Sequence, residues 1–287
     1  MKERILKRFD EDIAALEREL KTELPKEIQR ARDQLMIQDL NPGVRTSPAR
    51  TAPIVRTNPA YVAQVSQPVN AGAIDYDALQ VALVKRFASD YSYRVSYTLG
   101  YSRGNTSGAA IPLSGFQYLN DLNLDLNEGP TNVDRRHVLT ISGQALIPKT
   151  HGLTFAWVVR TLSGAPFTLF DSTTDPDLNG QFTEPLPAGS YTGTPGPNRN
   201  PWTVDAEGER NGARGPGLFQ ADVRFGYRLR PGQSRTLDLF MDAFNITNRA
   251  NFDNPLGDRR LPDFLNLTAL RAGAIPTTVQ FGVRMGF

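Results

Sequence analysis

The protein has 287 residues, a length that suits one large domain or two medium ones. Of these residues 39% are hydrophobic, and the mean hydropathy is −0.38. Its 32 basic and 30 acidic residues nearly balance, which gives no electrostatic basis for binding nucleic acid. The absence of cysteine excludes disulfides, thiolate metal sites and thiol catalysis. No apolar run reaches the roughly 18 residues of a transmembrane helix, so helical membrane spans are excluded.

Residues 1–32 have the pattern of one charged amphipathic helix. Apolar residues recur there every three or four positions, at Ile5, Phe9, Ile13, Leu16, Leu20 and Leu24. No apolar h-region follows Met1, so the sequence predicts no signal peptide. Residues 33–75 lack a period and contain several prolines, and we predict an irregular linker or loop there.

From residue 76 to the end, the period changes from helical to alternating. Seven segments place apolar residues on one face and polar residues on the other: 76–87, 91–102, 137–147, 153–163, 218–230, 236–247 and 277–287. A strand of 11–13 residues is about 36–43 Å long, and when tilted by about 45° it spans the ~25 Å apolar band of an outer membrane. The pattern therefore predicts membrane-spanning β-strands.

The connections between these segments alternate between short turns and long loops. An antiparallel meander built this way has all its turns at one rim and all its long loops at the other, as outer-membrane barrels do. Because seven strands are few for such a wall, we predict a mainly β fold: a partial, open outer-membrane β-barrel over 76–287, preceded by the helix. A soluble β-rich binding module is the alternative, although loops longer than about 12–15 residues are uncommon in compact domains.

Two segments show the alternation most clearly and predict which residues face the membrane. In 218–230 the polar face carries Asp222 and Arg224, and in 277–287 it carries Arg284. The opposite face is apolar, so we expect the following side chains to contact lipid: Val223, Phe225, Tyr227, Phe281, Val283 and Phe287.

One stretch in the longest loop, residues 175–180, resembles the start of a calcium-binding loop. Asp175, Asp177 and Asn179 offer alternating oxygen ligands before a glycine. The glutamate expected at position twelve is replaced by Leu186, and Glu184 comes two residues early, which is more typical of a polar turn. No other cofactor site and no nucleophile, zinc or phosphate-loop motif is found, so we expect a protein that is not an enzyme.

Several motifs resemble TonB-dependent outer-membrane receptors of the carboxypeptidase-regulatory-like type. They are YDALQV with KRF (76–81 and 85–87), NEGPTNVDRRH (127–137), DAFNITNRANF (242–252) and the terminal strand. The resemblance covers roughly residues 34–287. It implies a barrel closed around a plug domain, ligand-gated uptake of a siderophore, vitamin, sugar or peptide, and external long loops with a periplasmic C-terminus. It also implies three partners: outer-membrane lipid, the rest of the barrel and plug, and the barrel-assembly machinery, which reads the strand ending at Phe287.

Residues 14–32 resemble the first coiled-coil helix of Gre-type transcript-cleavage factors. The acidic tip that holds catalytic magnesium in that family does not follow Arg32, so its chemistry is not carried over. We therefore expect a receptor fragment joined to a foreign helix, as in a chimeric or misassembled reading frame. A regulatory or interaction protein that uses the Gre-like helix in transcription elongation is the alternative function.

Overall fold

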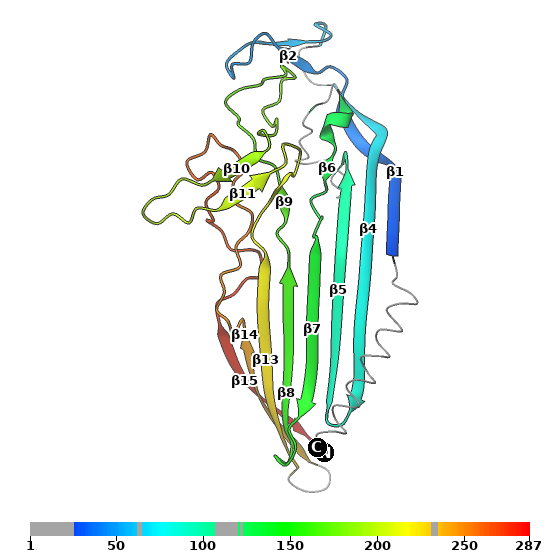
Figure 1. Ribbon diagram of the computed structural model, residues 1–287, viewed down its shortest axis with the longest axis vertical. Coiled ribbons are helices and arrows are strands. Elements are labelled where there is room, and N and C mark those ends of the chain that lie inside the picture. The colour runs from blue at the N-terminus through cyan, green and yellow to red at the C-terminus, as the bar shows by residue number, and fades with distance from the viewer. Residues whose placement is uncertain (1–25, 62–64, 107–119, 121–122, 231–234) are drawn as a thin grey trace.

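The computed structural model describes residues 26–61, 65–106, 120, 123–230 and 235–287, and its main feature is one curved antiparallel sheet (Figure 1). Eight long strands form it in the order β1-β4-β5-β7-β8-β13-β14-β15, and the short β6 (Gly129–Pro130) pairs with the end of β5. The long strands are β1 (Lys26–Asp39), β4 (Ser66–Ala88), β5 (Tyr91–Gly104), β7 (His137–Leu146), β8 (Leu153–Leu162), β13 (Leu218–Leu229), β14 (Thr236–Phe244) and β15 (Thr278–Gly286).

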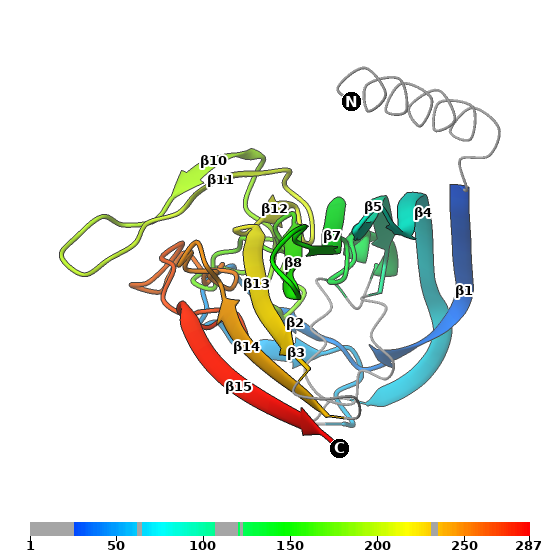
Figure 2. The same ribbon diagram turned by 90° about the horizontal axis from the view of Figure 1, so that it is seen from below.

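The sheet curves into an open wall and does not close (Figure 2). Strands β1 and β15 lie at its two edges, and among the described residues each pairs on one side only. The predicted mainly β, antiparallel, open architecture is thus confirmed. Within the described part of the chain, no helix is both long enough and apolar enough to cross a bilayer.

The seven predicted strands all form with small shifts at their ends, except that β4 begins ten residues before the predicted start. They correspond to β4, β5, β7, β8, β13, β14 and β15, each pairing with the next in sequence. The turn between β4 and β5 has positive φ at both Ser89 (55°) and Asp90 (71°). Two successive residues of this kind give the turn a twist that matches the twist of the flanking strands, which favours a tight hairpin.

Two predictions about the N-terminal part are wrong where the structure describes it. Residues 26–32 belong to β1 and not to a helix, and 33–75 contains the rest of β1, two short strands and the first ten residues of β4. The charged sequence of β1 favours a helix locally, but its hydrogen bonds to β4, from Lys26 opposite Leu79 to Asp39 opposite Ser66, override that preference. The remainder of the predicted helix, residues 1–25, lies outside the described residues.

The long loops build a packed layer at the rim opposite the short turns (Figure 1). We call residues 163–217 and 245–277 the rim cap. Its two segments are joined by backbone hydrogen bonds such as Phe170 N to Gly257 O (2.9 Å) and Leu267 N to Asn200 O (2.8 Å). Short elements at this end are β2 (Gly43–Arg45), β3 (Ile54–Arg56), β9 (Pro166–Phe167), β10 (Gly189–Thr192), β11 (Thr203–Ala206), β12 (Ala213–Arg214) and a 3₁₀ turn, η1 (Leu124–Asn127).

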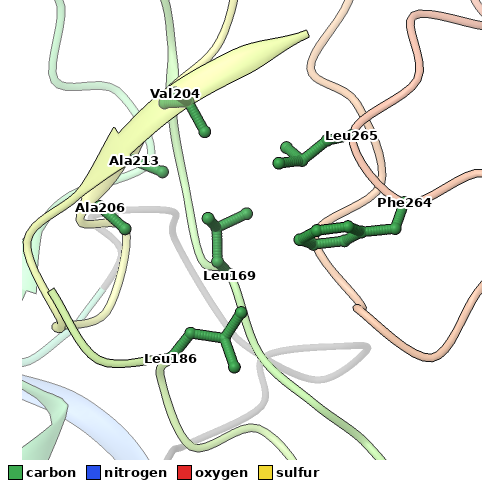
Figure 3. Packing of buried hydrophobic residues seen from close by; sticks show 7 residues of the cluster. All are labelled: Leu169, Leu186, Val204, Ala206, Ala213, Phe264 and Leu265. Atoms are coloured by element: carbon green, nitrogen blue, oxygen red, sulfur yellow. The ribbon is translucent and has the colours of Figure 1, made fainter. Parts of the chain in front are cut away.

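The rim cap, and not the sheet, holds the main cluster of buried hydrophobic side chains (Figure 3). Leu169 lies between Phe264 and Leu265 on one side and smaller apolar residues of β11 and β12 on the other (Figure 3). Phe167, Tyr191 and Trp202 pack against this cluster from outside. Because these residues come from both cap segments, their packing fixes the two long loops against each other.

Candidate functional site

The polar face of the sheet forms a hollow of about 590 Å³ that crosses β4, β5, β7, β8, β13 and β14. Cross-strand register places Arg224 opposite Asp242, and Arg224 Nη2 donates to Asp242 Oδ2 at 2.7 Å. Gln280 Nε2 donates to the same oxygen at 2.9 Å. Other polar residues that line the hollow are Lys85, Ser92, Tyr93, Arg94, Ser142, Gln144 and Asp222. A face this rich in charged and amide groups is suited to a hydrated interior.

The opposite face carries five of the six side chains that the sequence predicts to face lipid, and the sixth, Phe287, follows directly after β15. Register places Phe225 and Phe281 on either side of Met241, away from the Arg224–Asp242 pair. Phe281, Val283 and Phe287 are 81%, 61% and 92% exposed, which leaves a bare apolar surface at the β15 edge. The residues Val223, Phe225 and Tyr227 on β13 share this face, and the Phe225 ring lies 4.9 Å from that of Phe155.

Three carboxylates meet in the rim cap at the stretch that resembles a calcium loop. Asp175, Asp177 and Glu184 each offer an oxygen, and these oxygens lie within 4.8 Å of one another. Asp175 is fully buried, and Arg45 Nε from β2 lies 3.2 Å from its Oδ2. Burial, and to a smaller extent the neighbouring carboxylates, raise the pKa of Glu184 to about 7. Burial also raises the pKa of Asp175.

Asn179, the third predicted calcium ligand, is not one of the three residues of the carboxylate group but makes hydrogen bonds within the loop. Its Nδ2 donates to Asp177 Oδ2 at 3.0 Å, and its Oδ1 accepts a hydrogen bond from Gln181 N at 2.7 Å. Asn179 therefore holds the turn in shape, while Glu184 occupies the third position of the carboxylate group. The spacing of a helix–loop–helix calcium site predicts a glutamate at position 186. In this loop the glutamate that joins the two aspartates is Glu184, two residues earlier.

A second polar network lies where residues 127–137 enter β7. Asp134 Oδ1 accepts a hydrogen bond from Ser102 N at 3.0 Å, its Oδ2 forms an ion pair with Arg214 Nη2, and Arg136 Nε lies 3.7 Å away. Asp134 is buried, and its partners come from β5, β12 and its own segment. This network fixes the rim cap to the sheet.

Two asparagines in 242–252 also connect separate segments through side-chain hydrogen bonds, a role that the sequence did not predict. Asn251 pairs with the backbone of Phe219 as a strand residue would: its Oδ1 accepts from Phe219 N at 3.0 Å and its Nδ2 donates to Phe219 O at 3.0 Å. Asn245, buried and at φ 47°, donates through Nδ2 to Ile275 O at 2.8 Å. The sequence offers no other indication of these roles than the place of both residues in the segment 242–252.

A family model described as an outer membrane beta barrel domain matches residues 27–282. The chain belongs to the outer membrane beta barrel domain family. The match begins in β1, which agrees with the place of that strand in the wall, and ends in β15. No curated protein and no solved structure gives a significant match to the chain.

Membership of this family means that the curved sheet is part of an outer-membrane barrel. The soluble-module alternative gains no support from the comparisons, and neither does the resemblance to Gre-type factors. The apolar face, the polar hollow and the rim cap can therefore be considered as parts of a barrel wall and its loops.

We expect the rim cap of this barrel protein to lose stability as the pH rises from about 4.5 through 7 in a chelating buffer. The raised pKa of Glu184 means that the folded cap binds its proton more tightly than the unfolded chain does, so ionisation favours unfolding. Chemical denaturation of the detergent-refolded protein at pH 5 and pH 8 would measure this. Glu184→Gln should flatten the dependence, and an equal slope in that variant would contradict the assignment.

Proposed function

We propose that the chain forms part of the barrel wall of a TonB-dependent receptor of the carboxypeptidase-regulatory-like type. In the complete receptor this wall would serve ligand-gated uptake of a siderophore, vitamin, sugar or peptide, without chemical catalysis. The observation that carries the proposal is the open sheet: β1 and β15 each pair on one side only among the described residues. Outer-membrane transporters of this kind have about 22 strands around a plugged lumen, so further strands would continue from these edges.

The two faces of the sheet support a place between lipid and a hydrated interior. Phe225 and Phe281 lie on the exposed apolar face, which suits contact with outer-membrane lipid. The paired charges of Arg224 and Asp242 lie on the other face, which suits contact with a polar plug domain. Edge strand β15, with the exposed Phe287 directly after it, is the segment that we expect the barrel-assembly machinery to bind.

The rim cap supports an orientation with its loops outside the cell and the C-terminus in the periplasm. Outer-membrane barrels have long external loops and short periplasmic turns, and the short turns here lie at the end opposite the cap. The packed core around Leu169 would give the external loops a fixed shape, so that a ligand meets a preformed surface.

The proposal can be tested in outer membranes of the producing bacterium with an antibody against cap residues 193–201. We expect the antibody to precipitate one polypeptide that contains a plug domain as well as these strands, as peptide mass spectrometry would show. Deletion of that gene, or of the gene for TonB, should abolish uptake of the ligand while other outer-membrane proteins remain at normal levels.

Two results would overturn the receptor proposal. The first is a precipitated species that contains only the strands described here and no plug. The second is uptake that persists at the normal rate without TonB. The protein would then be an outer-membrane barrel of another type within the same family.

A further inference from the structure

In the part of the chain that the structure describes, the carboxylate of Glu184 is buried and has no hydrogen-bond partner. Each of its oxygens is sealed from solvent, and neither has a hydrogen-bond partner among the described residues. A buried polar group is normally paired, and a buried ionised one must be paired or coordinated, because otherwise its desolvation is not compensated. The missing partner of Glu184 is therefore a proton or a cation.

The neighbourhood of Glu184 is negatively charged. Oxygens of Asp175 and Asp177 lie within 4.8 Å of an oxygen of Glu184, so three carboxylates share a small volume. Among the residues that the structure describes, Arg45 is the cation paired with this group, through Asp175. Its Nη1 is also held by the carbonyls of Arg50 (2.9 Å) and Ala52 (2.8 Å), which fixes the guanidinium on the β2 side. Three carboxylates and one guanidinium leave two negative charges, which a divalent cation would balance.

The carboxylates are held in place before any cation arrives. Asp175 Oδ2 accepts a hydrogen bond from Gly180 N at 2.9 Å, and Asp177 Oδ2 accepts one from Asn120 Nδ2 at 2.8 Å. Gly180 has φ 87°, and a Cβ there would lie 2.5 Å from the carbonyl oxygen of Gly43, so the loop sits tightly against β2. Such an arrangement lowers the cost of ordering ligands on binding. Asp177 is exposed and leaves a route from solvent.

We propose that Asp175, Asp177 and Glu184 bind one divalent cation in the rim cap, with calcium preferred. All three ligands are hard oxygen donors, and calcium accepts irregular oxygen sets completed by water more readily than magnesium does. The cation would join the loop of residues 175–184 and, through Arg45 and Asn120, two other segments of the rim. It would thereby stabilise the external surface of the barrel. This inference does not depend on the receptor type proposed above.

The test is calcium titration of the full chain, refolded in detergent micelles and freed of metal with a chelator. Isothermal titration should show one site with a Kd of about 10⁻⁴–10⁻³ M, the range of extracellular calcium modules, and weaker binding of magnesium. Glu184→Gln and Asp177→Asn should each weaken calcium binding at least tenfold. Asp205→Asn, which removes an exposed carboxylate of β11 outside the cluster, should leave the affinity unchanged.

The proposal is overturned if the unaltered chain binds no calcium at about 10 mM, since a proton alone would then neutralise Glu184. It is also overturned if both variants bind calcium as the unaltered chain does. Should Glu184→Gln prevent refolding, the exposed Asp177 provides a variant that keeps the fold and decides the question. Uptake by a complete receptor is not involved, so failure here and failure of the receptor proposal can be told apart.

Discussion

Replacing Phe225 with arginine should destabilise the membrane-inserted protein by about 2–4 kcal/mol, the cost of an arginine on the lipid face near the bilayer midplane. Phe225 lies on the apolar face of β13, opposite Phe155 on one side and Met241 on the other. A guanidinium at that position has no polar residue directly opposite it on either neighbouring strand, so it must be accommodated in the hydrocarbon of the bilayer. Reversible denaturation from lipid vesicles would measure the difference in free energy of unfolding.

The matched control is Gln144→Arg, which places the same side chain on the polar face of the sheet, on strand β7. Gln144 is exposed and lies opposite Ala156 of β8, whose other neighbour across the sheet is Arg224. An arginine there would face the hydrated hollow, and we expect a cost below about 1 kcal/mol. Equal costs for the two variants, or a larger cost for Gln144→Arg, would show that the lipid and lumen faces have been assigned the wrong way round.

The faces of the sheet were predictable because alternation is a local signal in each strand. The sequence alone assigned Arg224 to the polar face, and the register places Asp242 of the next strand directly opposite it. Phe240 interrupts the alternation of β14, because it is a large aromatic residue on the polar face. The next strand explains why an aromatic residue fits there. Gly282 lies opposite Phe240, and the Phe240 ring occupies the space that a Cβ at position 282 would need. One strand alone does not contain that information.

Strand β1 could not be predicted for a related reason. Its sequence, KEIQRARDQLMIQD, has charges and apolar residues without a period of two, and its start continues a helical spacing. What makes it a strand is pairing with β4 residues about 30 to 50 positions later, including shifts of register near Gln34. Such non-local pairing overrides local preference, and no inspection of residues 26–39 alone reveals it.

The carboxylate group was predicted in part. Asp175 and Asp177 are close in sequence and follow a recognisable pattern of oxygen donors, so their shared place was visible. The proximity of Glu184 depends on how the loop folds back, and that of Arg45 depends on packing between two loops about 130 residues apart. The hydrophobic cluster of the rim cap could not be predicted either, because its members come from short, separate segments of two loops that only the fold brings together.

Replacing Leu265 with alanine should destabilise the rim cap by about 2–5 kcal/mol while leaving the wall of the barrel intact. Leu265 is fully buried in the cluster with Leu169 and Phe264. Its backbone bonds, to Leu256 O (3.0 Å) and from Trp202 N (2.7 Å), involve no side chain and remain available in the variant. The loss is therefore one of packing: the methyl groups removed leave a cavity that neighbours from two different loops fill only partly.

The two tryptophans allow the cap and the wall to be followed separately. Trp202 packs against the cap cluster, and Trp157 lies on β8 over Gly143. In a Trp157→Phe background, the fluorescence transition of Trp202 in denaturant should move to lower concentration with Leu265→Ala. It should hardly move with Leu270→Ala, because Leu270 is 49% exposed in the same loop. In a Trp202→Phe background, the transition of Trp157 should stay in place. If instead it shifts as far as that of Trp202, the cap and the wall unfold as one unit, and the hydrophobic cluster stabilises the whole barrel segment.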